Sequence, residues 1–253
     1  VGYMEDFHTA GGMGTLLREL QPLLHMDCQT VTGETLGERL KTAPGYVDRA
    51  IIRSREEPFE AVGGLVALFG NLAPGGAILK RSAADPTLFE HTGRAVVFTS
   101  LEDLADRIDS DDLDVKADDI LVLQNAGPKS PAGMPEAGYI PIPKKLARAG
   151  VKDMVRISDC RMSGTAFGTI VLHVTPEAAM GGVIGLVQNG DEISLSISDK
   201  SLILNINDDE IARRRQAMPP QPARPARGYA KLYADHVTQA DQGVDFDFLM
   251  AAD

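Results

Sequence analysis

Residues 154–172 read MVRISDCRMSGTAFGTIVL, and this stretch decides the fold because it joins two apolar runs through a turn. The runs at 154–157 and 169–172 are short and apolar, as strands inside a sheet are. The residues between them are rich in Ser, Gly and Thr, which favour turns. We therefore predict a strand, a loop and a strand, with Ser163 at the mouth of the loop where little steric cover would separate it from a ligand.

Similar apolar runs bounded by turn formers predict further strands at 77–79, 95–98 and 120–123. Downstream, residues 183–206 predict a three-strand meander with strands at 183–188, 193–197 and 202–206. Asn189-Gly190 is the strongest short hairpin signal. Ile193, Leu195 and Ile197 alternate with polar residues, which predicts one buried and one solvated face.

Helices are predicted on both sides of these strands. The predicted helical segments are a leucine-rich one around 16–24 that Pro22 bends or ends, a short one opened by the capping box Thr35–Glu38, and 101–108, 144–149, 208–217 and 229–240. Residues 45–60 are polar and irregular, and residues 219–227 form a proline-rich linker. The pattern predicts a mixed α/β chain: a β-barrel or sandwich with flanking helices, preceded by a helical piece of another domain.

Composition excludes several classes of function. The chain has 253 residues, a net charge of −11 and 5% aromatic residues. An acidic surface repels duplex nucleic acid and anionic membranes, and few aromatic rings are available to stack on single-stranded bases. Cys28 and Cys160 lie far apart without metal-ligand spacing, so we expect no disulfide framework and a cytoplasmic location. The apolar run 61–70 is too short to span a membrane.

Two loops carry candidate chemistry. Glu136 follows Pro135 in a glycine-rich loop, and its carboxylate is a hard oxygen ligand that suits Mg²⁺. Ser163 is a hydroxyl in a Gly-bounded turn. Local sequence alone favours the plainer interpretation of both residues, a solvated loop carboxylate for Glu136 and a hydroxyl bonded to its own backbone for Ser163. The turn Asn125–Pro128 ends a predicted strand, where ligands bind in open α/β sheets.

At these residues the chain resembles the dihydroxy-acid and sugar-acid dehydratase family. The matching segments are Gly11–Met13, Asp27–Leu36, Gly70–Pro74, Asn125–Pro128, Gly133–Glu136, Ser158–Gly168 and His173–Ala178. Their order and spacing fit over nearly the whole chain. The resemblance implies a barrel-like, swivelling β/β/α carboxyl-terminal domain at 61–253, preceded by the end of the N-terminal, cluster-binding domain at 1–60.

The resemblance also implies a reaction and a role for three residues. It implies a hydro-lyase that converts a sugar acid to a 2-keto-3-deoxy acid with Mg²⁺ and a [2Fe–2S] cluster. Glu136 inherits the role of Mg²⁺ ligand, and Ser163 inherits that of the base that removes the C2 proton. Thr165 is expected to support Ser163 or the substrate. The metal would favour the alkoxide form of the serine.

The chain departs from the family because the cluster cysteines and the remaining Mg²⁺ ligands belong to an N-terminal domain that it lacks. We therefore expect the chain alone to be inactive, its partners to be its own N-terminal domain and a second copy in a homodimer or homotetramer, and no nucleic acid or membrane to bind. The serine motif and the segment 239–249 look more like pentonate and hexonate dehydratases, such as those of arabinonate or xylonate. The alternatives are a branched-chain dihydroxy-acid dehydratase and a non-catalytic barrel module.

Overall fold

A computed structural model of the chain describes residues 2–136, 138, 140–161, 163, 164, 166–218 and 225–250. It divides into two units, Val1–Gly63 and Gly64–Asp253. The first unit contains helices α1 (Met4–Thr9), α2 (Gly12–Glu19) and α3 (Leu36–Lys41). Pro22 follows α2 in a 3-10 helix, Gln21–Leu23, and the Thr35 hydroxyl caps α3 by accepting from the Glu38 N–H, as the sequence predicted.

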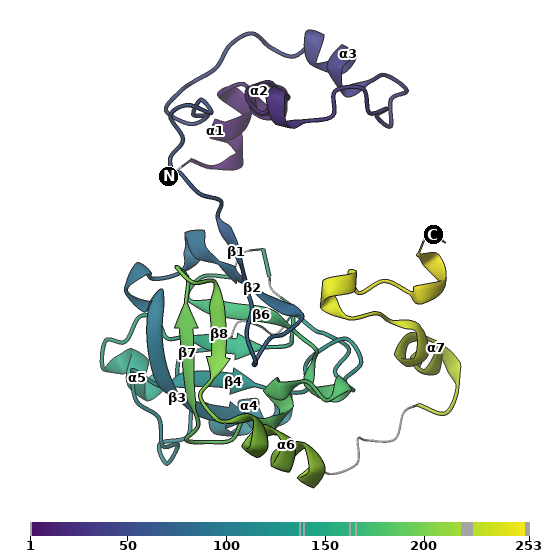
Figure 1. Cartoon of the computed structure of the whole chain (residues 1–253). Coiled ribbons are helices and arrows are strands. Elements are labelled where there is room, and N and C mark those ends of the chain that lie inside the picture. The colour runs from purple at the N-terminus through teal and green to yellow at the C-terminus, as the bar shows by residue number, and fades with distance from the viewer. Residues whose placement is uncertain are drawn as a thin grey trace. The chain divides into compact units, whose positions relative to one another are not determined.

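The second unit is built on a sheet that has eight strands in the described residues, in the order β1-β2-β6-β5-β4-β3-β7-β8 (Figure 1). The strands are β1 (Leu65–Leu68), β2 (Gly76–Lys80), β3 (Glu90–Phe98), β4 (Ile120–Leu123), β5 (Arg156–Ser158), β6 (Ile170–Thr175), β7 (Glu192–Ser196) and β8 (Ser201–Leu204). Helices α4 (Leu101–Arg107), α5 (Lys144–Arg148), α6 (Asp208–Ala217) and α7 (Gly228–His236) accompany them.

The sheet is a nearly closed barrel. Its four central strands, β3 to β6, pair in parallel, whereas β1, β2, β7 and β8 pair antiparallel with their neighbours. Phe69 forms a bridge with Ser201, which brings the chain after β1 against the start of β8. The mixed α/β, barrel-like fold predicted from the sequence is therefore confirmed.

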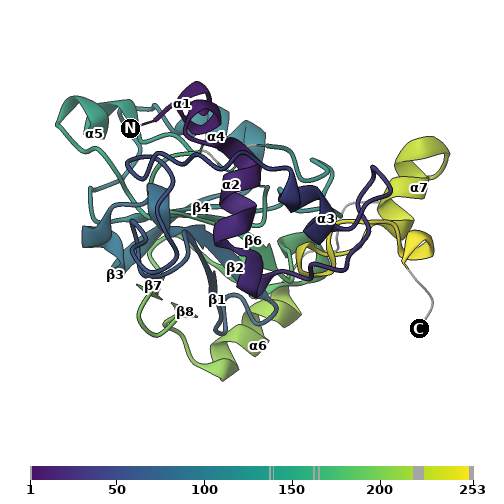
Figure 2. The ribbon, with the colours of Figure 1, turned by 90° about the horizontal axis from the view of Figure 1, so that it is seen from above.

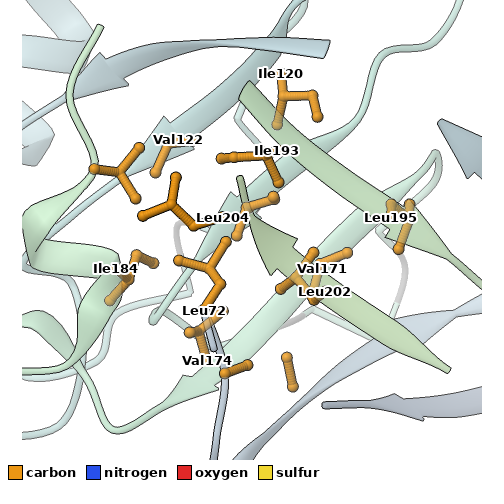
Figure 3. Packing of buried hydrophobic residues seen from close by; sticks show 14 of the residues in the cluster. Leu72, Ile120, Val122, Val171, Val174, Ile184, Ile193, Leu195, Leu202 and Leu204 are labelled. Carbon is orange, nitrogen blue, oxygen red and sulfur yellow. The ribbon is translucent and has the colours of Figure 1, made fainter. Parts of the chain in front are cut away.

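Alternate residues of the central strands bury their side chains in two cores. In β4, Ile120 and Val122 enter the barrel interior, and Leu121 and Leu123 pack in a second cluster with α4 and its neighbours. Figure 3 shows side chains of several strands and of Ile184 meeting in the interior cluster. Burial on both faces explains why these strands read as continuous apolar runs.

The predicted meander is wrong in its first strand. Val183–Leu186 is a 3-10 helix, and β7 pairs with β3 instead. The Asn189-Gly190 turn packs on β3, because Asn189 Oδ1 accepts from the Val97 N–H at 2.6 Å and the Gly190 N–H donates to the Ala95 carbonyl at 2.9 Å. The turn therefore hydrogen-bonds to a strand that is distant in the sequence, and it does not close a local hairpin.

The predicted helix 229–240 is also too long. Helix α7 ends at His236, where Val237 turns extended and forms a bridge with Phe246. The tail therefore folds back beside α7, as two views show (Figure 1, Figure 2). Of the predicted proline-rich linker, residues 219–224 lie outside the described residues. No helix in the described residues has the length and apolar character needed to cross a membrane.

Candidate active site

The loops that carry Glu136 and Ser163 converge. Glu136 lies on the connection from β4 to α5, and Ser163 lies on the connection from β5 to β6. A side-chain hydrogen bond joins Ser163 and Glu136, and Arg161 Nη2 lies 2.8 Å from Glu136 Oε2. This hydrogen bond, followed by the charge of Arg161, holds the pKa of Glu136 below its usual range. The Glu136 side chain is 46% exposed, so it is an ionised carboxylate open to a ligand.

The turn before Glu136 has an unusual backbone. Gly133 and Met134 have φ values of 65° and 53°, in the left-handed region. Met134 tolerates this because its side chain is buried and its N–H donates to the Gly127 carbonyl at 3.0 Å. The turn thereby directs Pro135 and Glu136 out of the core toward the serine loop.

Close packing also joins the two loops. The Cys160 thiol donates to the Pro135 carbonyl, with 3.3 Å between sulfur and oxygen. A Cβ on Gly138 would lie 2.2 Å from Leu172 Cδ1 and 2.9 Å from the Arg161 carbonyl oxygen, so only glycine fits between them. Thr165, the third predicted site residue, lies outside the described residues and its role stays a prediction.

A buried ion pair anchors the far end of the serine loop. Arg156 is 1% exposed, and its Nη2 lies 2.6 Å from Asp153 Oδ1. Asp153 Oδ2 also accepts from the N–H and the hydroxyl of Thr169, at 2.8 Å each. Gly168 has a φ of 113°, and a Cβ there would lie 1.9 Å from Arg156 Nη2. The loop therefore returns to the sheet at a position where a side chain would displace the ion pair.

Asp159 anchors the near end of the same loop. Its Oδ1 accepts from the Ala126 N–H and its Oδ2 from the Ala178 N–H, both at 2.9 Å. The side chain is fully buried, and burial raises the pKa of Asp159 to about 6 despite these hydrogen bonds. That Asn125–Pro128 binds a ligand stays a prediction. The Ala126 N–H of that turn donates to the Asp159 carboxylate.

The Glu177 carboxylate joins two further segments of the chain. Its carboxylate accepts from the N–H groups of Lys129 and Ser130 and from Gln239 Nε2. Burial raises the pKa of Glu177 in spite of these donors. The loop that leads to Glu136 and the tail after α7 are thus tied to one carboxylate. Asp159 and Glu177 were not among the predicted site residues, although each lies in a segment that carries the family resemblance.

The described residues offer few ligands for a metal ion. In the described parts of the chain, no group of three or more His, Cys, Asp or Glu side chains could hold a metal ion. Glu136 alone of the predicted residues offers an exposed carboxylate, which suits one bond to Mg²⁺. Cys28 is exposed in the first unit and Cys160 is buried in the second. Burial, with a smaller effect of Arg161, lowers the pKa of His173, which favours a neutral imidazole.

Comparison with known families gives two matches. The family model described as dihydroxy-acid/6-phosphogluconate dehydratase C-terminal matches residues 50–244. The corresponding N-terminal model matches residues 2–39. Together they leave few residues of the chain unmatched.

Curated relatives agree with these matches. The chain is 49% identical over 253 residues to a 6-deoxy-6-sulfo-D-gluconate dehydratase of Pseudomonas putida, covering 99% of this chain and 44% of the relative. It is 49% identical to an L-arabonate dehydratase of Azospirillum brasilense, covering 98% of this chain and 44% of the relative. An L-arabinonate dehydratase of Rhizobium leguminosarum is 47% identical, with 97% and 43% covered. The chain thus spans less than half the length of these relatives.

Proposed function

We propose, from the premise that the chain belongs to the dihydroxy-acid/6-phosphogluconate dehydratase family, that it forms the carboxyl-terminal part of a sugar-acid hydro-lyase. The observation that carries this proposal is the contact between Ser163 and Glu136, which lie on separate loops. If Ser163 and Glu136 were only turn residues, nothing would require their loops to meet. Their contact across separate connections therefore supports one shared site.

In the proposed reaction, Ser163 acts as the base on a 2,3-dihydroxy acid. Its oxygen, in the alkoxide form, takes the proton from C2, and the electron pair of that C–H bond becomes a double bond between C2 and C3. The C3–OH bond breaks and the oxygen leaves with the bonding pair, to become water once protonated. The resulting enol takes up a proton at C3 as its C2 hydroxyl loses one, and yields the 2-keto-3-deoxy acid.

The chain's own residues orient Ser163 for this role but do not ionise it, because a neighbouring carboxylate disfavours a second negative charge. Glu136 accepts the hydrogen bond of the serine, which orients the hydroxyl, and Arg161 offsets the carboxylate charge. A serine is a weak base at its ordinary pKa, so an additional positive charge must favour its alkoxide. Glu136 would hold Mg²⁺ through one oxygen, and the bound metal would supply that charge and polarise the acid.

The second predicted cofactor does not fit the described residues. A [2Fe–2S] cluster takes four ligands, usually thiolates. Cys28 and Cys160 belong to different units, and Cys160 is buried with its thiol donating to a backbone carbonyl. We therefore derive no step through a cluster in this chain. We propose that its ligands, and the other Mg²⁺ ligands, come from an N-terminal domain outside residues 1–253.

The proposed substrate class is an aldonic acid. Two relatives are named for arabonate or arabinonate and one for a sulfogluconate, all of them polyhydroxy acids. We also propose a homodimeric or homotetrameric enzyme of the cytoplasm and an inactive isolated fragment, as the resemblance implies. The family description includes dihydroxy acids, so a branched dihydroxy acid is the alternative that a test must separate.

A substrate panel tests this proposal on the full-length protein. We expect L-arabinonate, D-xylonate or D-gluconate to yield a 2-keto acid, with kcat/KM at least about tenfold above that for 2,3-dihydroxy-3-methylbutanoate, because a site that hydrogen-bonds the hydroxyls of its substrate discriminates strongly against an acid that lacks them. The keto product is measured as its semicarbazone. Turnover of the branched acid alone would contradict the proposed substrate class, and no turnover of any member would contradict the proposed function.

A further inference from the structure

Within the described part of the serine loop, Gly164 lies outside the packed residues. Gly164, next to Ser163, is exposed, and a Cβ there would meet no heavy atom of the described chain within 4 Å. The Ala166 N–H donates to the Ser163 carbonyl at 3.1 Å, and the buried Ala166 packs with Ile170 and Leu172 of β6, so the turn contacts the sheet after Gly164 but not at it. The buried carboxylates described above anchor only the two ends of the loop.

Lys80 connects this tip to the sheet. Its Nζ donates to the Gly164 carbonyl oxygen at 2.7 Å. Lys80 is the last residue of β2, and its Cα lies opposite Leu65 of β1. The preceding Leu79 is fully buried and pairs with Val171 of β6. The ammonium therefore extends from a backbone position that pairs with β1 and directly follows a residue that pairs with β6.

The partner of Lys80 is a backbone carbonyl rather than a carboxylate, as it also is for Lys145. The net charge is −11, so carboxylates outnumber cations, and other lysines such as Lys144 pair with one. Among the described residues, the structure gives the Lys80 ammonium the Gly164 carbonyl and no carboxylate. A hydrogen bond from a charged donor is stronger than one between neutral groups, which suits the attachment of an exposed turn.

We propose that Lys80 is a positioning residue for Ser163, an inference that rests on the proposed function. By holding the Gly164 carbonyl, Lys80 fixes the backbone directly after Ser163 and so the direction of the serine oxygen. Glu136 restrains the same side chain from the other loop. The serine is thus held at its hydroxyl by a group from the connection between β4 and α5, and at its backbone by a group from strand β2.

The test compares Lys80→Met with Lys80→Arg in the full-length enzyme. We expect Lys80→Met to lower kcat by about 10–100-fold with little change in KM, because a displacement of about 1 Å costs up to about 100-fold in rate. Removal of the C2 proton should then limit the rate, so the kinetic isotope effect with C2-deuterated substrate should increase. Lys80→Arg keeps a charged donor and should recover most of kcat.

Two variants serve as controls. Lys144→Met removes an exposed lysine that pairs with Asp109 on the surface, and it should keep the wild-type kcat. Ser163→Ala reports on the proposed function separately: if it turns over normally, Ser163 is not the base and Lys80 has nothing to position. If Ser163→Ala is inactive while Lys80→Met keeps kcat, only the positioning role fails. An equal loss in Lys80→Met and Lys80→Arg with an unchanged isotope effect also overturns that role.

Discussion

Replacing Ser163 by Ala in the full-length enzyme is expected to lower kcat by about 10²–10⁴-fold, the usual contribution of a positioned general base. The substitution removes the one atom that is proposed to take the C2 proton, while Glu136 and Arg161 stay on their own backbone positions. The metal content should therefore remain close to that of the wild type. Steady-state turnover of an aldonate and elemental analysis of the purified protein measure the two quantities.

A second serine provides the matched control. Ser198 is exposed on the turn between β7 and β8, where its hydroxyl contacts Ser196 and Glu90. Ser198→Ala should leave both kcat and metal content unchanged. Wild-type turnover by Ser163→Ala would mean that another group removes the proton.

Replacing Asp153 by Ala is expected to lower the free energy of unfolding by about 3–5 kcal/mol, because removal of one partner leaves a buried charge uncompensated. The Arg156 side chain is 2% exposed and that of Asp153 is 6% exposed. The substitution also takes the acceptor from the N–H and hydroxyl of Thr169, at the end of the serine loop. Urea unfolding monitored by circular dichroism measures the loss.

An exposed aspartate serves as the comparison for Asp153. Asp112 lies on the surface and has no ion pair in the described part of the structure. Asp112→Ala should change the free energy of unfolding by less than about 0.5 kcal/mol. Equal, small effects of the two substitutions would show that the buried pair does not hold the loop.

The central strands were predictable because each is buried on both faces. Ile120–Leu123 contains only large aliphatic residues, and a short apolar run bounded by turn formers is consistent with a buried strand. The runs around Ser163 also contain Arg156 and Thr169, and β5 begins at Arg156, two residues later than predicted. Strand β1 and the first half of β3 were missed. Residues 90–94 of β3 are mostly polar, and their pairing with β7 is set by backbone contacts that a local pattern does not encode.

The site was predictable only in part. The motifs identified Glu136 and Ser163, but neither composition nor spacing could show that the two loops meet. That contact depends on Gly138 and Cys160, whose importance comes from neighbours far away in the sequence. Asp159 carries no distinguishing local signal, because an aspartate in a Ser-rich turn is common at the surface. Asp159 is buried only because the folded chain places the segments of Ala126 and Ala178 against it.

The central claim is that Glu136 and Ser163 act as one site, and a double-mutant cycle tests it most directly. The values of kcat/KM are measured for wild-type full-length enzyme, Glu136→Gln, Ser163→Ala and the double variant, with an aldonate as substrate. Groups that act as a unit lose their function together, so we predict that the double variant is no worse than the poorer single variant. Losses that multiply, each substitution having its full effect in the presence of the other, would contradict the account.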